Sequence, residues 1–229
     1  MDRILSHIKN KTPSLCVFCD ANSHANKLVC DICFQDWYEH SDFIHWGDIL
    51  QFSSAQNSIE ASGLSSVYCL AEHQPPFSQL ITQYKYKADR IAQSALSQII
   101  AAAPPKLPQF DIISAVPMHW TRLSTRGFNQ AQWIAEQLSP FIDAQLLPIL
   151  QRNKRTKRQA ELDAKERKLN LQSAFTLNKD YSVEGLSILL VDDVVTTGST
   201  INTIAQLLRA QGAKQVSAIT LSWAKLDHE

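Results

Sequence analysis

Long apolar runs are absent from this 229-residue sequence, although 45% of its residues are hydrophobic. A membrane-spanning helix needs a run of about 18 apolar residues or more, so we expect none here. The opening segment, MDRILSHIKNKTPS, carries scattered charges and no apolar core, which argues against a secretory signal peptide. We therefore expect a cytoplasmic protein without membrane insertion.

Two further absences narrow the class of protein. The formal net charge is zero, which argues against strong affinity of the whole chain for a polyanion. No G-x-x-x-x-G-K-[ST] motif occurs, so nucleotide binding through a P-loop is excluded. Charge is nevertheless uneven, because residues 151–170 carry eight Lys or Arg against three Asp or Glu. This basic segment on an otherwise acidic chain predicts an anionic ligand nearby.

The sequence has only five cysteines, and they are unevenly distributed. Four of the five cysteines form two C-x-x-C pairs with ten residues between them: Cys16, Cys19, Cys30 and Cys33. This ligand count and pairing predict a tetrahedral structural zinc site with no open coordination position. Two disulfides or a redox pair are the alternatives, although a cytosolic chain disfavours disulfides. The fifth, Cys69, lies in an apolar stretch, and we expect a buried, inert thiol.

The segment 188–200, ILLVDDVVTTGST, combines three features of a ligand site. Its apolar start predicts a strand covered on both faces, and Asp192 and Asp193 stand where that strand is expected to end. An amphipathic helix should follow, capped by Ser199 or Thr200. Ligands bind beyond the carboxyl ends of such strands, and a helix N-terminus favours an anion. We therefore predict a sugar-phosphate site in which the carboxylates accept from sugar hydroxyls and a hydroxyl-rich turn holds the phosphate: Thr196, Thr197, Gly198, Ser199 and Thr200. Receiver domains share the Asp-Asp pattern but do not need this turn.

Two other loops have residues suited to an anion. The predicted strand 111–116 runs into PMHWTRLSTRGFNQA, whose arginines, glycine and amides suit a diphosphate: Arg122, Arg126, Gly127 and Asn129. Ordinary surface arginines in a solvated turn are the alternative. The connector 151–170, which includes Arg152 and Arg167, is long enough to be functional or mobile. A solvated charged helix and a nucleic-acid contact strip are its alternatives.

The motif YKYK, residues 84–87, has two interpretations. Alternating aromatic and basic side chains can stack on and neutralise a nucleotide. Within a helix, the same motif is equally consistent with one buried tyrosine and exposed lysines.

Strands alternate with helices along the rest of the chain, which predicts an α/β fold with a doubly wound parallel sheet flanked by helices. The expected strands are 67–72, 111–116, 172–177, 188–191 and 216–221, and the expected helices include 77–100 and 130–138. We expect a small four-cysteine module over residues 1–45, a linker and short strand over 46–75, and the main domain over 76–229.

Segment 188–200 resembles the phosphoribosyl pyrophosphate (PRPP) signature of type I phosphoribosyltransferases. Together with the paired C-x-x-C, YKYK and RGFNQ, it makes the chain similar to the ComF family of phosphoribosyltransferase-like proteins, which carry an N-terminal zinc ribbon. The resemblance implies that Asp192 and Asp193 contact the ribose 2′- and 3′-hydroxyls, and that residues 196–200 wrap the 5′-phosphate. It also implies PRPP contacts from Arg122, Gly127 and Asn129, and a magnesium ion that bridges the ribose and the pyrophosphate.

For the reaction, the resemblance implies that three arginines stabilise the departing pyrophosphate: Arg126, Arg152 and Arg167. The family is associated with competence, as DNA uptake and natural transformation, or with use of DNA as a nutrient. The expected partners are PRPP, single-stranded DNA and DNA-uptake or recombination proteins. Two hypotheses stay open at this point: a phosphoribosyltransferase, and a non-enzymatic PRPP-responsive module that binds single-stranded DNA through the zinc ribbon and the basic loop.

Overall fold

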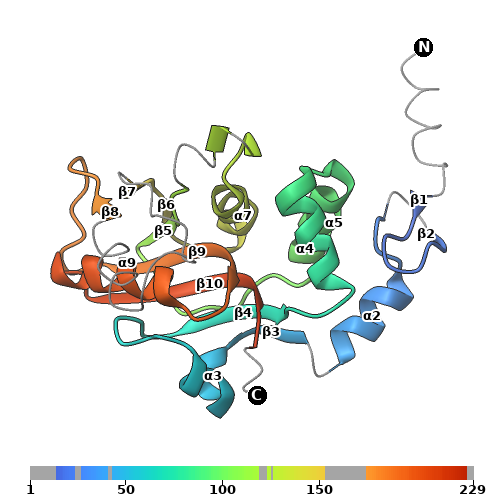
Figure 1. Cartoon of the computed structure of the whole chain (residues 1–229), viewed down its shortest axis with the longest axis horizontal. Coiled ribbons are helices and arrows are strands. Elements are labelled where there is room, and N and C mark those ends of the chain that lie inside the picture. Colours follow the sequence, from blue (N-terminus) through green and yellow to red (C-terminus); the bar gives the residue numbers. More distant parts are fainter. Residues whose placement is uncertain are drawn as a thin grey trace, which may run out of the picture.

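The computed structural model of the chain describes residues 14–23, 27–40, 43–118, 123–124, 126–152 and 174–225. Its centre is a six-stranded sheet in the order β3-β4-β10-β9-β5-β6 (Figure 1). Five strands are parallel: β4 (Val67–Glu72), β5 (Ile112–Ala115), β6 (Gln145–Leu146), β9 (Ser187–Val195) and β10 (Gln215–Trp223). The edge strand β3 (Phe43–Asp48) pairs with β4 in the antiparallel direction.

Helices cover both faces of this sheet. They are α4 (Phe77–Lys87), α5 (Arg90–Ala102), α7 (Gln130–Leu138) and α9 (Ser199–Ala210). In Figure 1, α4, α5 and α7 lie above the sheet. The connection from β9 to β10 crosses the sheet in the opposite direction to those from β4 to β5 and from β5 to β6. Right-handed crossovers therefore place α9 on the other face. The predicted doubly wound α/β fold is confirmed.

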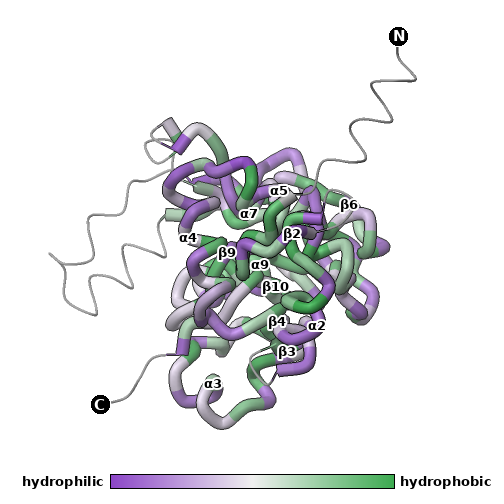
Figure 2. Tube along the Cα trace, turned by 90° about the vertical axis from the view of Figure 1, so that its right-hand side faces the viewer, coloured by the Kyte–Doolittle hydropathy of each residue, from purple (hydrophilic) through white to green (hydrophobic). Residues whose placement is uncertain are grey.

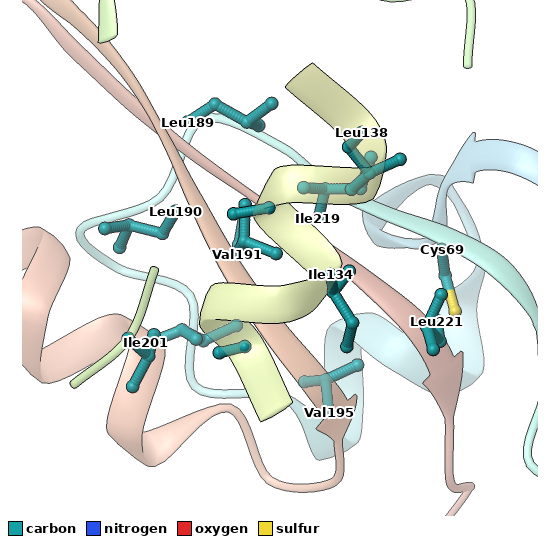
Figure 3. Packing of buried hydrophobic residues seen from close by; sticks show 14 of the residues in the cluster. Cys69, Ile134, Leu138, Leu189, Leu190, Val191, Val195, Ile201, Ile219 and Leu221 are labelled. Carbon is teal, nitrogen blue, oxygen red and sulfur yellow. The ribbon is translucent and has the colours of Figure 1, made fainter. Parts of the chain in front are cut away.

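The core lies on both sides of β9 and β10. The apolar run 188–191 is fully buried, as expected for a strand with helices on both faces. Figure 3 shows Ile134 and Leu138 of α7 beside β9, with Ile201 of α9 also in this cluster. In Figure 2, hydrophobic segments run through the middle of the molecule, where β9 and β10 are labelled. Among the described residues, every helix is too short or too polar to traverse a lipid bilayer.

The cysteine module packs directly against this core. It contains a two-stranded sheet, β1 (Ser14–Leu15) with β2 (Asn22–Ser23), followed by α2 (Asp31–Glu39). Trp37 of α2 is buried, and its ring centroid lies 4.6 Å from that of Phe43 and 4.7 Å from that of Phe77. The Leu28 backbone N–H donates to Gln98 Oε1 of α5 at 2.8 Å. The module is therefore tied to β3, α4 and α5.

Several element predictions need correction. The expected single helix 77–100 is two helices, because Ala88 adopts a left-handed conformation and Asp89 caps α5 through Ile91 N and Ala92 N. The segment 46–75, for which we expected a linker and one short strand, also contains η1 (Ile49–Gln51) and α3 (Ser53–Ser58). The expected strand 172–177 appears as β8 (Phe175–Leu177), which pairs with β7 (Leu150–Arg152) outside the main sheet. A short turn, η2 (Ser139–Phe141), follows α7.

Candidate functional site

A pocket of about 680 Å³ opens at the carboxyl end of the parallel strands. Segments far apart in the sequence meet there: the ends of β4, β5, β7 and β9, the last turns of α4, and the start of α7. Ligands bind at this edge in open α/β sheets, and the volume suits a nucleotide-sized molecule.

The two adjacent carboxylates of β9 lie in this pocket. The strand does not end at them but continues to Val195, so their side chains point to opposite faces of the sheet. Asp193 is 8% exposed and pairs with Lys85 of α4, whose Nζ lies 2.8 Å from Oδ2 and 3.0 Å from Oδ1. Asp193 Oδ1 also accepts from the Val194 backbone N–H at 2.8 Å. Asp193 is thus held in one orientation.

Asp192 has different surroundings. Its Oδ1 accepts from the Asp193 backbone N–H at 2.9 Å. Burial and the neighbouring Asp193 charge raise the pKa of Asp192 to about 7. The hydrogen bond from the Asp193 backbone N–H and the charges of Lys85 and Arg152 act in the opposite direction. The Arg152 guanidinium itself stacks on the Phe175 ring, 5.0 Å from the centroid. The pair therefore offers one carboxylate held in an ion pair and one carboxyl group that titrates near neutral pH.

The hydroxyl-rich turn follows β9. Gly198 has φ +72 and is the N-cap of α9, which begins at Ser199 without a side-chain cap. The expectation that Ser199 or Thr200 caps the helix is therefore wrong. The Thr197 and Ser199 hydroxyls lie 2.9 Å apart, and Thr197 O accepts from the Glu60 backbone N–H at 2.8 Å. Such a turn at a helix start presents hydroxyls and N–H groups to an anion.

A segment that the sequence left unassigned supports this turn. Asn202 of α9 is 4% exposed, and its Oδ1 accepts from Gly63 N at 2.8 Å and from Ser62 Oγ at 3.4 Å. The Gln206 amide donates to Ser62 Oγ at 2.9 Å. Residues 59–63 thus hold the start of α9, although no pattern in 46–66 pointed to it.

The loop after β5 faces the carboxylates across the pocket. Gly127 has φ +80, and its N–H donates to Leu123 O at 2.7 Å. Asn129 caps α7 by accepting from Ala131 N at 3.2 Å, and its amide donates to Val116 O at 3.1 Å. The structure therefore gives Asn129 a role in shaping the loop. The Arg126 guanidinium lies 4.9 Å from the Tyr86 ring centroid.

Most predicted site residues meet in one place. Seven line the pocket: Arg126, Asn129, Arg152, Asp192, Asp193, Thr196 and Thr200. Four others lie in the same two loops but outside the lining: Gly127, Thr197, Gly198 and Ser199. Arg122 and Arg167 fall outside the described residues.

Sequence reasoning missed other lining residues. Lys85 and Tyr86 belong to the YKYK motif, which was a visible signal without a clear assignment. His73 follows β4, and its Nδ1 lies 2.8 Å from Ser222 Oγ. Burial and the nearby Lys85 charge lower the pKa of His73, and the Asp193 charge acts in the opposite direction. A lowered pKa favours the neutral imidazole near pH 7. No sequence pattern marked His73.

The four paired cysteines form a separate site. Their sulfur atoms all lie within 4.8 Å of one another, so the cluster could hold a metal ion. Cys19 and Cys30 sulfurs are 3.8 Å apart, which fits the spacing of about 3.8 Å expected for Zn–S bonds near 2.3 Å in a tetrahedron. The Cys30 and Cys33 N–H groups each donate to a cluster sulfur at 3.4 Å. All five cysteines are free thiols, and burial raises the pKa of Cys69 to about 12, as expected for an inert thiol.

Comparisons with known proteins identify the family of this chain. The family model described as "Phosphoribosyl transferase domain" matches residues 123–227, which include β9, α9 and β10, so the fold is of the phosphoribosyltransferase type. Competence protein F of Haemophilus influenzae is 30% identical over 225 residues, covering 91% of this chain and 96% of that protein. DNA utilization protein YhgH of Escherichia coli strain K12 is 38% identical over 154 residues, covering 64% of this chain and 67% of that protein. The chain belongs to the ComF family of phosphoribosyltransferase-like proteins.

Among solved structures, a hypoxanthine phosphoribosyltransferase from Staphylococcus aureus overlaps with 67% of this chain and 64% of its own. The two are 17% identical, with a TM-score of 0.31. This overlap is too limited to carry an argument.

Proposed function

We propose that this protein binds PRPP together with magnesium and acts as a phosphoribosyltransferase-like protein in competence, as DNA uptake and transformation, or in the use of DNA as a nutrient. The ligand is proposed from the pocket, and the biological setting from relatives named for competence and DNA utilization.

One observation carries the ligand assignment. Adjacent carboxylates on β9 lead directly into a hydroxyl-rich turn at the start of α9, and arginines line the same pocket. Carboxylates accept from ribose hydroxyls, the turn suits a terminal phosphate, and guanidinium groups suit a diphosphate. PRPP carries all three groups on one molecule, with the ribose between the 5′-phosphate and the diphosphate.

The chain's own residues suggest how ribosyl transfer would proceed. Asp192 and Asp193 would hold the ribose, and Arg126 and Arg152 would stabilise the negative charge on the leaving diphosphate. The expected contribution of Arg167 belongs to the same step, as a proposal from the sequence alone.

Two metals belong to the proposal. The cysteine cluster would hold a structural zinc ion, because four thiolates saturate a tetrahedral site. Among the described residues, the cysteines are the only group of three or more potential ligands, so the pocket does not itself form a protein cage for magnesium. This fits a hard cation that prefers phosphate oxygens and water and enters with PRPP, where it would neutralise diphosphate charge.

Calorimetric titration tests the ligand. PRPP with magnesium is titrated into the zinc-replete parent and into an Asp192→Asn/Asp193→Asn variant, which is close to isosteric. We expect binding by the parent and its loss in the variant, with the melting temperature of both recorded. A folded parent that does not bind PRPP would refute the assignment. Release of pyrophosphate in the presence of an acceptor then distinguishes an enzyme from a binding protein.

The second candidate function is binding of single-stranded DNA by the cysteine module and the basic loop. It is favoured by the clustered cysteines of the module and by a relative of the chain that is named for DNA utilization. Fluorescence anisotropy of a labelled single strand, measured over a range of salt concentrations, tests it. Salt-sensitive binding that persists in Asp192→Asn/Asp193→Asn would place DNA outside the pocket, and no binding at low salt would reject this candidate.

A further inference from the structure

The YKYK segment at the end of α4 is anchored before it reaches the pocket. Tyr84 is 1% exposed, and its ring lies 5.2 Å from Phe128 and 4.8 Å from Trp133, measured between centroids. Its hydroxyl donates to Gln130 O at 3.4 Å. The end of α4 is thereby fixed against the loop that follows β5 and against the start of α7.

The next residue reaches the sugar side of the site. Lys85 contacts both oxygens of Asp193, and the two side chains are 21% and 11% exposed. A partly buried ion pair of this kind restrains both partners more than a surface pair does. Because Asp193 stands next to another carboxylate, Lys85 also offsets the repulsion between them.

The residue after that reaches the diphosphate side. Tyr86 is 66% exposed, yet its ring face is covered by the Arg126 guanidinium at 4.9 Å. This contact orients the guanidinium at the pocket wall. Lys87, one residue further, is exposed and does not line the pocket.

We propose that Lys85 and Tyr86 are positioning residues that set the two halves of the site relative to each other. Lys85 orients the sugar-binding carboxylate of Asp193, and Tyr86 orients the diphosphate-binding guanidinium of Arg126. The inference rests on the proposed function, since it assumes that a ribose and a diphosphate occupy these halves. This arrangement favours ligands that carry both a ribose and a diphosphate. Ribose 5-phosphate, which carries only the sugar and the terminal phosphate, should bind less tightly.

Calorimetry with two ligands separates the two roles. PRPP and ribose 5-phosphate, each with magnesium, are titrated into the parent, Lys85→Met, Tyr86→Leu and the control Lys87→Met. Lys85→Met should weaken the binding of both ligands about tenfold, because the Asp193 carboxylate loses the ammonium group that orients it. Tyr86→Leu should weaken PRPP about threefold and leave ribose 5-phosphate unchanged, because only the guanidinium contact is lost. Lys87→Met should change neither, and Lys85→Arg and Tyr86→Phe should largely restore binding.

The outcomes that overturn the inference are distinct from those that overturn the function. A parent that binds neither ligand refutes the proposed function and, with it, this inference. A parent that binds PRPP, with Lys85→Met indistinguishable from Lys87→Met, refutes the inference alone. Tyr86→Leu that weakens both ligands equally refutes the role of Tyr86.

A ligand-free measurement checks the pair itself. Melting temperatures are compared for Lys85→Met, Asp193→Asn and the double variant. If Lys85 acts through Asp193, the double variant should melt no lower than Asp193→Asn. Additive losses would show that Lys85 supports the fold independently of Asp193 and would overturn its positioning role.

Discussion

At the scale of single residues, chemically similar groups in this structure have different surroundings. Asp192 and Asp193 are neighbours in sequence, but among the described residues an ammonium group contacts Asp193 alone. Gly185 and Gly198 share a left-handed φ of +72, but only Gly198 is closely surrounded. These differences come from tertiary contacts and lead to two predictions.

Replacing Gly198 with alanine should disrupt the phosphate turn. The new Cβ would lie 2.6 Å from Ile59 Cγ2 and 2.9 Å from Glu60 O, at a φ of +72. We expect a loss of about 2–4 kcal/mol in the free energy of unfolding, from the clash together with the left-handed backbone. Gly185→Ala is the matched control, since no atom of the described residues lies within 4 Å of the added Cβ, and it should lose only about 1–2 kcal/mol. Equal losses in urea unfolding would contradict the clash.

The raised pKa of Asp192 predicts a pH dependence. Between the ordinary value of 3.8 and about 7, the folded protein holds a proton that the unfolded chain releases. The contribution of this group to stability is therefore complete below pH 3.8 and is lost as the pH rises through 7. Burial is the largest cause of this raised pKa, the Asp193 charge adds to it, and the charges of Lys85 and Arg152 oppose it.

Asp192→Asn should remove the part of the pH dependence of the unfolding free energy that comes from this group. Chemical unfolding at successive pH values measures it. In the parent, PRPP affinity should fall as the pH drops through 7, because a protonated carboxyl group is a weaker acceptor. Identical pH slopes in parent and variant would show that Asp192 titrates normally.

At the scale of elements, α9 and the segment 59–63 form one unit around the turn. Asn202 on the helix accepts two hydrogen bonds from this segment, and Glu60 N–H reaches back to Thr197. Gly63 lies so close to the helix that a Cβ there would be 2.9 Å from Gln206 N. The geometry of the turn is therefore fixed from two sides.

Asn202→Ala should loosen this unit. It leaves the Gly63 N–H without its acceptor in a partly buried position, which costs about 1–3 kcal/mol. Urea unfolding measures this loss, and PRPP titration measures the accompanying fall in affinity. Asn202→Asp keeps the acceptor oxygen and should retain most of the stability. An alanine variant as stable as the parent would mean that water replaces the amide.

At the scale of the whole molecule, the cysteine module and the sheet behave as connected parts. Trp37 packs between residues of β3 and α4, and Leu28 bonds to α5. A change in the cysteine cluster is therefore transmitted to the sheet edge. This connection could not be predicted from the sequence, in which a linker and a short strand were expected between the module and the main domain.

Removal of the metal should destabilise more than the module. If the cluster holds zinc as proposed, Cys30→Ser should lose it, measured as metal per chain by mass spectrometry, and should lower the melting temperature by several degrees. Cys69→Ala removes a buried cysteine outside the cluster and should keep a full complement of zinc. Retention of zinc by Cys30→Ser would contradict the assignment of that ligand.

The sequence predicted those parts of the site that lie in one continuous motif. The buried strand 188–191, the adjacent carboxylates and Gly198 were visible because apolar pattern, charge and turn chemistry coincide within 188–200. Helix α7 was predicted with its observed bounds because its apolar spacing is regular and Asn129 caps it.

Other parts could not be predicted because they exist only through long-range contacts. Lys85 and Asp193 are 108 positions apart in the sequence, and no local sequence pattern predicts that they form a pair. The break between α4 and α5 was missed because Ala88 is a strong helix former in most settings. The small strand β8 was expected in the main sheet, but strand propensity does not specify a partner.

The position of β10 has a consequence for synthesis. This strand, at residues 215–223, lies between β4 and β9 and joins the two halves of the sheet, although it is made after every other strand described. Until it leaves the ribosome, β3 and β4 cannot pair with β9, β5 and β6. The strands on the two sides of β10 can therefore join into one continuous sheet only after this last strand has been made.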